Sequence, residues 1–336
     1  MTDPQALQKL VQDVANRLRE RRVSVAVVGD MILDNAIEGV PGGRHPEMGM
    51  PILREATTHE SIGGAANIAL ALARLGVDVA LFGVIGHDLP GRQMENLLDR
   101  QPFSSHLVTE RGWPTPRKDW IYERQGNRVS LLQRIDYDRP LSGTAREELV
   151  GEFRARCPAT VDVVIRADHG LGSIGPESLA LVSLAKVRRA KLVAIPRTTV
   201  LRGQPFDAIV INGAEMRQMA EAGEDADPRV LAARYAREYA QHVFLPLLEE
   251  GIVVCPAGAR SSGILVEGFP LESAQWMGAR DMATALIAVG LVLGLDPLDN
   301  ARVANAFRHL VARQRGNGRV LWRDIFEFVG LESEAS

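Results

Sequence analysis

The sequence predicts an α/β protein with a mostly parallel central sheet, helices on both faces of that sheet and a small β lid. Two observations carry this prediction. Short runs rich in β-branched residues alternate along the chain with helical patterns, as in folds with crossover helices. Two stretches, at about 38–60 and 115–137, break the alternation with strand-like and turn-like composition, which assigns them to the lid.

The elements follow one another at short intervals. Asp3-Pro4 predicts a helix start, because aspartate caps helices and proline suits the first helical position. Apolar residues at helical spacing continue that first helix: Leu7, Leu10, Val11, Val14 and Leu18. Strands are expected at 23–28, 77–84, 161–165, 191–195, 208–211 and 252–254. Helices are expected at 65–75, 177–186, 228–240 and 282–295.

This order of elements also predicts where ligands bind. In a parallel sheet the ligand site lies beyond the carboxyl ends of the strands, so we expect Asp30, Asp168, Asn212 and Gly258 there. The lid segment around Gly126-Asn127 predicts a hairpin. Since no repeat or linker interrupts the pattern, residues 1–336 are expected to form one domain that includes the lid.

Composition excludes several classes of protein. Hydrophobic residues make up 46% and charged residues 24% of the chain, as in ordinary globular proteins. A formal charge of −3 offers no basic surface for nucleic acid. The two cysteines, Cys157 and Cys255, form neither a disulfide framework nor a zinc site, which favours a reducing, cytoplasmic location. The charged N-terminus does not resemble a signal peptide, and run 282–295 is too short to cross a bilayer.

The segment Gly278-Ala279-Arg280-Asp281 is the most informative local pattern. Two small residues before a helix leave backbone N–H groups free to bind an anion. Asp281 stands beside this anion hole, where it either caps the helix or acts as a general base for a phosphoryl acceptor. Arg280 is a large cation at a place where close approach of a phosphate favours glycine.

Three motifs together resemble the ribokinase/PfkB superfamily of carbohydrate kinases. Residues 61–67, Ser-Ile-Gly-Gly-Ala-Ala-Asn, are similar to its first signature. Residues 278–281 are similar to its second signature, normally Gly-Ala-Gly-Asp, and Asn212 and Glu215 match its Asn-x-x-Glu motif. The resemblance covers nearly the whole chain and implies a ribokinase-like three-layer sandwich that uses ATP and magnesium.

Further segments resemble the heptose-phosphate kinases of ADP-heptose synthesis. Residues 28–34 are similar to their first strand and turn, and 46–51 to their Pro-Glu-x-Pro-x-Pro lid segment. Residues 114–118 and 132–136 resemble their second pair of lid strands, and 168–172 their Asp-Tyr-Gly-Lys-Gly loop. This resemblance implies a sugar phosphate as the acceptor, and a homodimer formed through the lid.

The resemblance implies a role for each matched residue. The catalytic loop would be Gly278, Ala279, Arg280 and Asp281. The sugar phosphate would be bound by Asp34, Glu47, Gly63, Gly64, Asn67, Lys118, Arg134 and Asp168. The nucleotide would be bound by Asn212, Glu215, Arg197 and Gly258, with Glu215 acting on magnesium through water.

Each of these roles has a structural alternative. Asn212 and Glu215 also fit a turn with a helix cap, and Gly63 and Gly64 fit an ordinary loop. The lid charges also fit a solvated hairpin. The seven histidines have no metal-ligand spacing, and only His169, beside Asp168, falls near the expected site.

The departures from the family pattern are concentrated at the residues that carry the chemistry, and most of the nucleotide side is changed. They comprise Arg280, Gln275, Met277, Met282, Leu171, residues 195–197, residues 255–260 and residues 313–318. Arg280 has three alternatives: it points away from the anion hole, it fills the phosphate site, or it clamps the transferred phosphoryl group.

Three hypotheses follow. The first is an ATP-dependent kinase that acts on a hydroxyl of a heptose-phosphate-like sugar phosphate. The second is a degenerate relative, a pseudokinase, that binds a sugar phosphate or a partner protein without phosphoryl transfer. The third is a kinase with a different phosphate donor.

Overall fold

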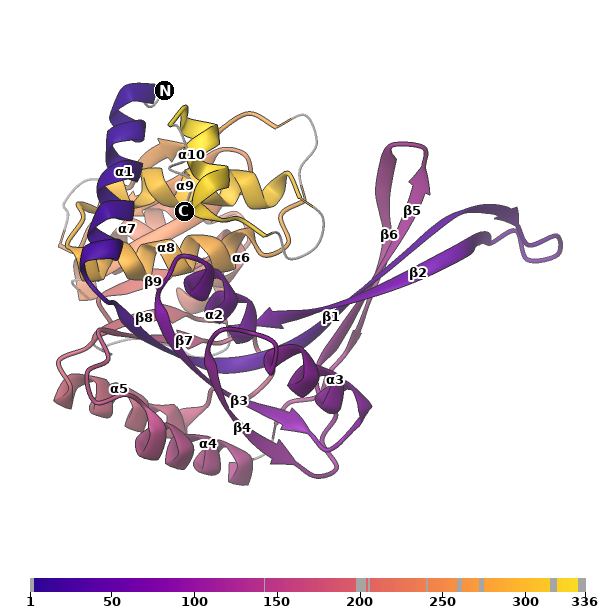
Figure 1. The fold of residues 1–336 in the computed structure, drawn as a ribbon, viewed down its shortest axis with the longest axis horizontal. Coiled ribbons are helices and arrows are strands. Elements are labelled where there is room, and N and C mark those ends of the chain that lie inside the picture. Colours follow the sequence, from indigo (N-terminus) through magenta and orange to yellow (C-terminus); the bar gives the residue numbers. More distant parts are fainter. Residues whose placement is uncertain are drawn as a thin grey trace.

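The computed structural model describes residues 3–141, 143–197, 204, 206–239, 241–258, 262–271, 275–314 and 319–331. At its centre lies a mostly parallel sheet, as the sequence predicts (Figure 1). Its strands lie in the order β12-β11-β10-β9-β8-β7-β1-β3-β4, and only the pairs β10–β11 and β11–β12 are antiparallel. The strands are β1 (Ser24–Arg44), β3 (Asp78–Gly86), β4 (Ser104–Glu110), β7 (Val163–Ala167), β8 (Lys191–Ile195), β9 (Ala208–Val210), β10 (His242–Leu247), β11 (Gly251–Cys255) and β12 (Ile264–Glu267).

Helices cover both faces of this sheet, because its strands are apolar on both sides. In β1, Val25 and Val27 join one core cluster while Ala26 and Val28 join the other. The first cluster includes residues of α1 (Pro4–Glu20), α2 (Ala65–Arg74), α3 (Leu89–Leu98), α8 (Ala279–Leu293), α9 (Pro297–Ala312) and α10 (Trp322–Val329). The second includes residues of α4 (Gly143–Arg156), α5 (Leu179–Val187), α6 (Gly213–Met219) and α7 (Pro228–Tyr239), and a 3₁₀ turn, η1 (Pro176–Ser178), precedes α5.

Strand β1 is much longer than the sequence predicts. It was expected to end near residue 29, but it continues to Arg44, because beyond Asp30 it leaves the central sheet and pairs with two other strands. These are β2 (Pro51–Gly64), which runs antiparallel to β1, and β5 (Arg117–Gln125), which runs parallel to it. The predicted hairpin joins β5 to β6 (Arg128–Tyr137). We call β2, β5, β6 and the outer half of β1 the arm, which projects from the body in Figure 1.

Helix boundaries decide the geometry of the site. Helix α1 begins as predicted, with the Asp3 carboxylate accepting from Gln5 N. Helix α8 begins at Ala279 rather than at the expected residue 282, so Arg280 and Asp281 lie in its first turn. Strand β4 was missed because its polar and apolar residues do not alternate clearly. Strand β10 contains Pro246, which argues against a strand, and β12 has only four residues.

Within the described part of the chain, no helix combines the length and apolar character needed to cross a bilayer.

Candidate active site

The N-terminus of α8 is the centre of the candidate site. Gly278 caps the helix without a side chain and has a φ of +72°, a left-handed conformation that glycine adopts at little cost. Among the described residues, the backbone N–H groups of Arg280 and Asp281 have no recorded partner. Free N–H groups at the first turn of a helix, together with the helix dipole, favour an anion.

Asp281 is held in place by a residue of another helix. The side chain of Asn67, in α2, donates a hydrogen bond of 2.8 Å from Nδ2 to Asp281 Oδ2. Burial raises the pKa of Asp281 from 3.8 to about 6, and the charge of Asp34 adds to the rise, while Asn67, Arg280 and Lys118 oppose it. A carboxylate with a pKa near 6 is well suited to accept a proton from a hydroxyl group near neutral pH.

The inner end of the arm brings a second carboxylate to the same place. Trp120, in β5, donates from Nε1 to Asp34 Oδ1 at 2.9 Å. Gly63, in β2, packs so closely that an added Cβ would lie 2.1 Å from Asp34 Oδ2. Lys118 pairs in register with Asp34, and burial lowers its pKa, while Asp136 and Asp34 oppose that shift. Asp34, Lys118 and Trp120 therefore form the wall of the site that faces Asp281.

Arg134 belongs to the same wall but already has partners. Its guanidinium lies 5.1 Å from the centroid of the Trp120 ring and pairs with Asp136 at 2.8 Å. Glycines complete the wall: Gly64, with a φ of +61°, ends β2 and caps α2, which carries Asn67. Gly63 and Gly64 thus lie at the end of a strand rather than in a loop.

A loop that follows β7 forms the floor of the site. Its backbone is held by the buried Asp30, whose carboxylate accepts from His169 N at 2.8 Å, Leu171 N at 3.1 Å and Ser173 N at 2.8 Å. Asp168 accepts from Gly170 N within the same loop. Asp30 was expected at this edge of the sheet, but its role as the anchor of the loop was not foreseen.

His169 lies among positive charges. Burial lowers its pKa well below 6.5, and Arg280, Lys118 and Arg197 lower it further, so its ring is neutral. Its Nε2 atom is buried and has no hydrogen-bond partner in the described part of the chain. The sequence places His169 near the site only through its neighbour Asp168, and nothing in the sequence alone shows its cationic surroundings.

Arg280 reaches across the site to Glu215. Its Nη1 atom donates to both carboxylate oxygens of Glu215, each at 2.8 Å. Asn212 and Glu215 also form a capping box at the start of α6: Asn212 Oδ1 accepts from Glu215 N, and Glu215 Oε2 accepts from Asn212 N. The structural alternative for this pair, a helix cap, is therefore present.

The Glu215 carboxylate as placed does not fit a magnesium ion. It accepts hydrogen bonds at both oxygens and faces a guanidinium that already neutralises it. Magnesium demands near-octahedral oxygen ligands and retains several waters, for which this pair leaves no room. Nowhere among the described residues do three or more His, Cys, Asp or Glu side chains gather in a group that could hold a metal ion.

Two predicted site residues lie elsewhere. Glu47 is exposed in the turn between β1 and β2, at the far tip of the arm, because β1 carries the chain outward for ten residues beyond Asp34 (Figure 1). Gly258 follows β11, which runs antiparallel to β10, so it lies beside the start of β10 rather than at the carboxyl edge. Arg197 is exposed near His169, whereas residues 259–261 and 315–318 lie outside the described residues.

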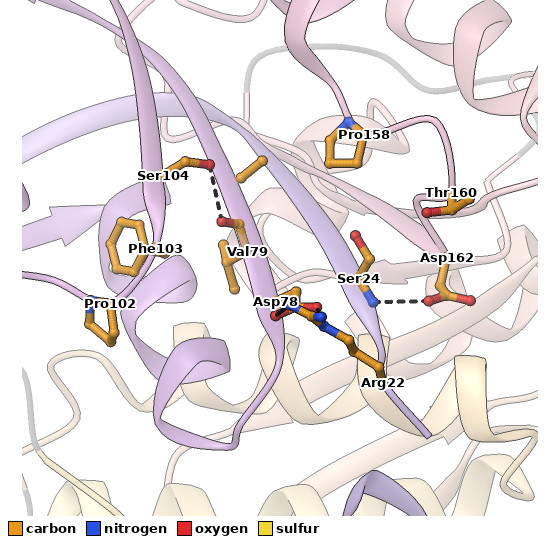
Figure 2. Close-up of a pocket in the computed structure, with 11 residues that line it drawn as sticks. Arg22, Ser24, Asp78, Val79, Pro102, Phe103, Ser104, Pro158, Thr160 and Asp162 are labelled. Atoms are coloured by element: carbon orange, nitrogen blue, oxygen red, sulfur yellow. Dashed lines mark hydrogen bonds and ion pairs between the residues drawn. The ribbon is translucent and has the colours of Figure 1, made fainter. Parts of the chain in front are cut away.

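Two cavities flank the sheet at opposite edges. A groove of about 540 Å³ lies against the inner face of the arm and is lined by Glu38, Ser61, Tyr122, Gln275 and Arg319, among others. A larger cavity of about 740 Å³ lies where β1, β3 and β4 begin (Figure 2). Since ligands of parallel sheets bind at the carboxyl ends of strands, the larger cavity lies away from the candidate site. The groove is lined mainly by residues of the arm, and Asp281, Arg280 and Asn67 are not among them.

Comparison with known proteins shows which proteins this chain resembles. The model of the pfkB family carbohydrate kinase matches residues 23–131. Over these residues, about a third of its length, the chain is similar to the pfkB carbohydrate kinases. It is 28% identical over 315 residues to the Bifunctional protein HldE of Caulobacter sp. (strain K31), covering 92% of this chain and 62% of that protein. It is 29% identical over 313 residues to HldE of Mesorhizobium japonicum, covering 89% of this chain and 60% of that protein. The chain thus spans about three fifths of the length of these curated relatives.

Several solved structures share the fold of this chain. Phosphofructokinase-2 from Escherichia coli, in complex with potassium, superposes with a TM-score of 0.72 at 15% identity, covering 92% of this chain and 98% of that one. Ribokinase from Arabidopsis thaliana, complexed with ribose and ATP, gives a TM-score of 0.64 at 18% identity, covering 93% and 100%. The ribokinase-like fold predicted from the sequence is therefore confirmed.

Proposed function

We propose that this protein is a kinase that transfers the γ-phosphoryl group of ATP to a hydroxyl group of a sugar phosphate. The observation that carries the proposal is the placement of Asp281, with a pKa of about 6, between a free helix N-terminus and the polar wall of the arm. As the acceptor oxygen attacks the γ-phosphorus, Asp281 takes its proton. The bond from the γ-phosphorus to the β–γ bridging oxygen breaks, and ADP leaves.

The acceptor site has the chemistry that a polyol phosphate requires. The Asp34 carboxylate and the Asn67 amide hydrogen-bond readily to sugar hydroxyls, and Lys118 and Arg134 supply positive charge for a phosphate. Resemblance to heptose-phosphate kinases, together with the similarity to HldE proteins, favours a heptose-phosphate-like acceptor. The backbone N–H groups of Arg280 and Asp281 have no partner among the described residues, and such groups can stabilise charge that develops on the transferred group.

The exposed arm favours a homodimer. Of the large apolar side chains that are exposed in the described residues, five lie on the arm: Met48, Met50, Leu131, Leu132 and Tyr137. An apolar projection of this kind is a liability for a monomer unless a partner covers it. We therefore propose that a second copy of this chain packs against the arm.

A direct assay tests the kinase proposal. The pure protein is incubated with ATP and a panel of heptose and hexose phosphates, with MgCl2 or with EDTA, and release of ADP is followed. We expect turnover with at least one sugar phosphate, and its loss in an Asp281→Asn variant. Asp299→Asn is the matched control, because Asp299 is also the third residue of a helix but lies in α9, away from the site. Absence of turnover with every acceptor, in both buffers, would refute the proposal.

The Arg280–Glu215 ion pair favours a second candidate function. If the guanidinium closes the nucleotide side, the protein binds a sugar phosphate without transferring a phosphoryl group. The same samples test this alternative by thermal unfolding. Stabilisation by a sugar phosphate but not by ATP, without turnover, would favour the pseudokinase over the kinase.

A further inference from the structure

The Arg280–Glu215 pair joins two residues that the family resemblance assigns to the phosphate side of the site. Glu215 is buried, and its carboxylate accepts three hydrogen bonds, one from Asn212 N and two from Arg280. A carboxylate has about four acceptor positions, so little capacity remains for the water shell of a cation. A divalent ion placed beside this carboxylate would also be repelled by the guanidinium that is bound to it.

Arg280 itself remains able to bind a ligand. Only Nη1 is engaged with Glu215, and in the described part of the chain Nη2 and Nε have no recorded acceptor. Its side chain is 22% exposed, so these donors are reachable from the site. A guanidinium presents its N–H groups in a planar fork that matches phosphate oxygens.

Other polar groups near Arg280 also have no recorded partner in the described part of the chain. The backbone N–H groups of Arg280 and Asp281 have no recorded partner among the described residues. His169, which is 92% buried, has an Nε2 atom without a partner and lies close to Arg280, Lys118 and Arg197. Three cations and several unpaired polar groups gathered in one place indicate a ligand with several negative charges.

We propose that Arg280, held by Glu215, supplies the cationic contact to the phosphate chain of a nucleoside triphosphate in place of a divalent cation, so that the nucleotide binds without metal. The identity of the nucleotide as phosphoryl donor rests on the proposed function. The ion pair holds the guanidinium of Arg280 in one position near the start of α8. A freely moving arginine would lose conformational entropy on binding the nucleotide, and an arginine that is already held loses less. Arg280 is then a nucleotide-binding residue rather than a block to the nucleotide.

Isothermal titration with β,γ-imido-ATP tests the proposal on the full chain, in MgCl2 and in EDTA. For the wild-type protein we expect dissociation constants that agree within about threefold between the two buffers. Arg280→Gly is expected to lose about tenfold or more in affinity in EDTA, because charged hydrogen bonds to phosphate are removed. The matched control, Arg302→Gly, removes an arginine that is ion-paired with Asp299 in α9, and should bind like the wild-type protein in both buffers.

Glu215→Gln separates this proposal from a role for Glu215 in metal binding. Glutamine keeps an oxygen that can accept from Asn212 N but removes the negative charge beside Arg280. We expect nucleotide affinity to fall by about threefold, equally in EDTA and in MgCl2, because the guanidinium of Arg280 is no longer held in place. If Glu215 instead positions a metal ion, the variant will lose the affinity that MgCl2 supports, which overturns the proposal.

The remaining outcomes are also decisive. A wild-type affinity that falls more than about tenfold in EDTA, or no nucleotide binding in either buffer, overturns the proposal. The binding experiment and the kinase assay can fail independently of each other. Metal-free nucleotide binding without turnover leaves this proposal standing and refutes the kinase, whereas turnover with binding that requires MgCl2 does the reverse. Thermal unfolding of each variant shows that any lost binding is not lost folding.

Discussion

The removal of the proposed base is the sharpest test of the site. Asp281→Asn keeps the size of the side chain and a polar partner for Asn67, but it cannot accept a proton. General-base assistance contributes about 10²- to 10⁴-fold to the rate, so we expect kcat to fall by at least about a hundredfold. Because proton transfer to Asp281 occurs in the transition state and not in the bound ground state, the KM for the sugar phosphate should change much less than kcat.

The pH dependence of the wild-type enzyme gives the same prediction an independent readout. With a pKa of about 6, Asp281 is roughly nine tenths ionised at pH 7 but only about one tenth ionised at pH 5. The base acts in its ionised form, so kcat/KM should rise about tenfold from pH 5 to pH 7. ADP release, measured across this range in buffers of constant ionic strength, reports the profile.

A control variant and two possible results test the role of Asp281 further. Asp299→Asn should keep both the rate and the profile of the wild-type protein, because Asp299 lies in the first turn of α9. A flat wild-type profile between pH 5 and pH 7, or an Asp281→Asn variant within about threefold of wild type, would show that Asp281 is not the base.

Three further predictions concern stability, packing and assembly. Folding raises the pKa of Asp281, so the folded state binds the proton more tightly than the unfolded state does. The free energy of unfolding of the wild-type protein should therefore fall as the pH rises from about 4 to about 6. Urea unfolding should show this loss in the wild-type protein and not in Asp281→Asn. Gly63→Ala should press a methyl group against Asp34, cost about 1–3 kcal/mol in calorimetry and weaken sugar-phosphate binding, whereas Gly151→Ala, in open space on α4, should do neither. Leu131→Asp, at a residue that is 50% exposed on the arm, should convert the proposed dimer to a monomer in sedimentation analysis; a wild-type monomer would refute the dimer.

Much of the fold was predictable because its signals are local. The run from Val25 to Val28 is apolar throughout, as expected for a strand that is buried on both faces. The hairpin at Gly126-Asn127 was identified from its turn residues alone. The continuation of β1 beyond Asp30 was not predictable, because pairing with β2 and β5 depends on partners that are distant in sequence.

The site was only partly predictable for a similar reason. The motifs predict Asp281, Asn67 and Asp34 as site residues, and in the structure the three lie close together. The sequence did not identify Trp120, whose indole orients Asp34, because an aromatic residue in a strand is usually a packing residue. It misplaced Gly258, because the reversal of direction at β11 sends the end of that strand to the opposite edge.

The Arg280–Glu215 pair shows why a departure from a family pattern has to be interpreted in three dimensions. In the sequence, Arg280 is a bulky residue in a loop that favours glycine, and Glu215 is a retained motif residue 65 positions away. In the structure, each alters the role expected of the other, since the carboxylate that would organise a metal ion now holds a guanidinium. Lys118 and Arg197 lie near the same histidine as Arg280, so an unpaired arginine in this loop would be repelled by their positive charges. The carboxylate of Glu215 offsets the charge of Arg280 and weakens this repulsion. The retained Glu215 therefore stabilises Arg280 in this loop. Because the two side chains are in contact, the effects of substituting them should not be additive, and a double variant is needed beside the two single ones.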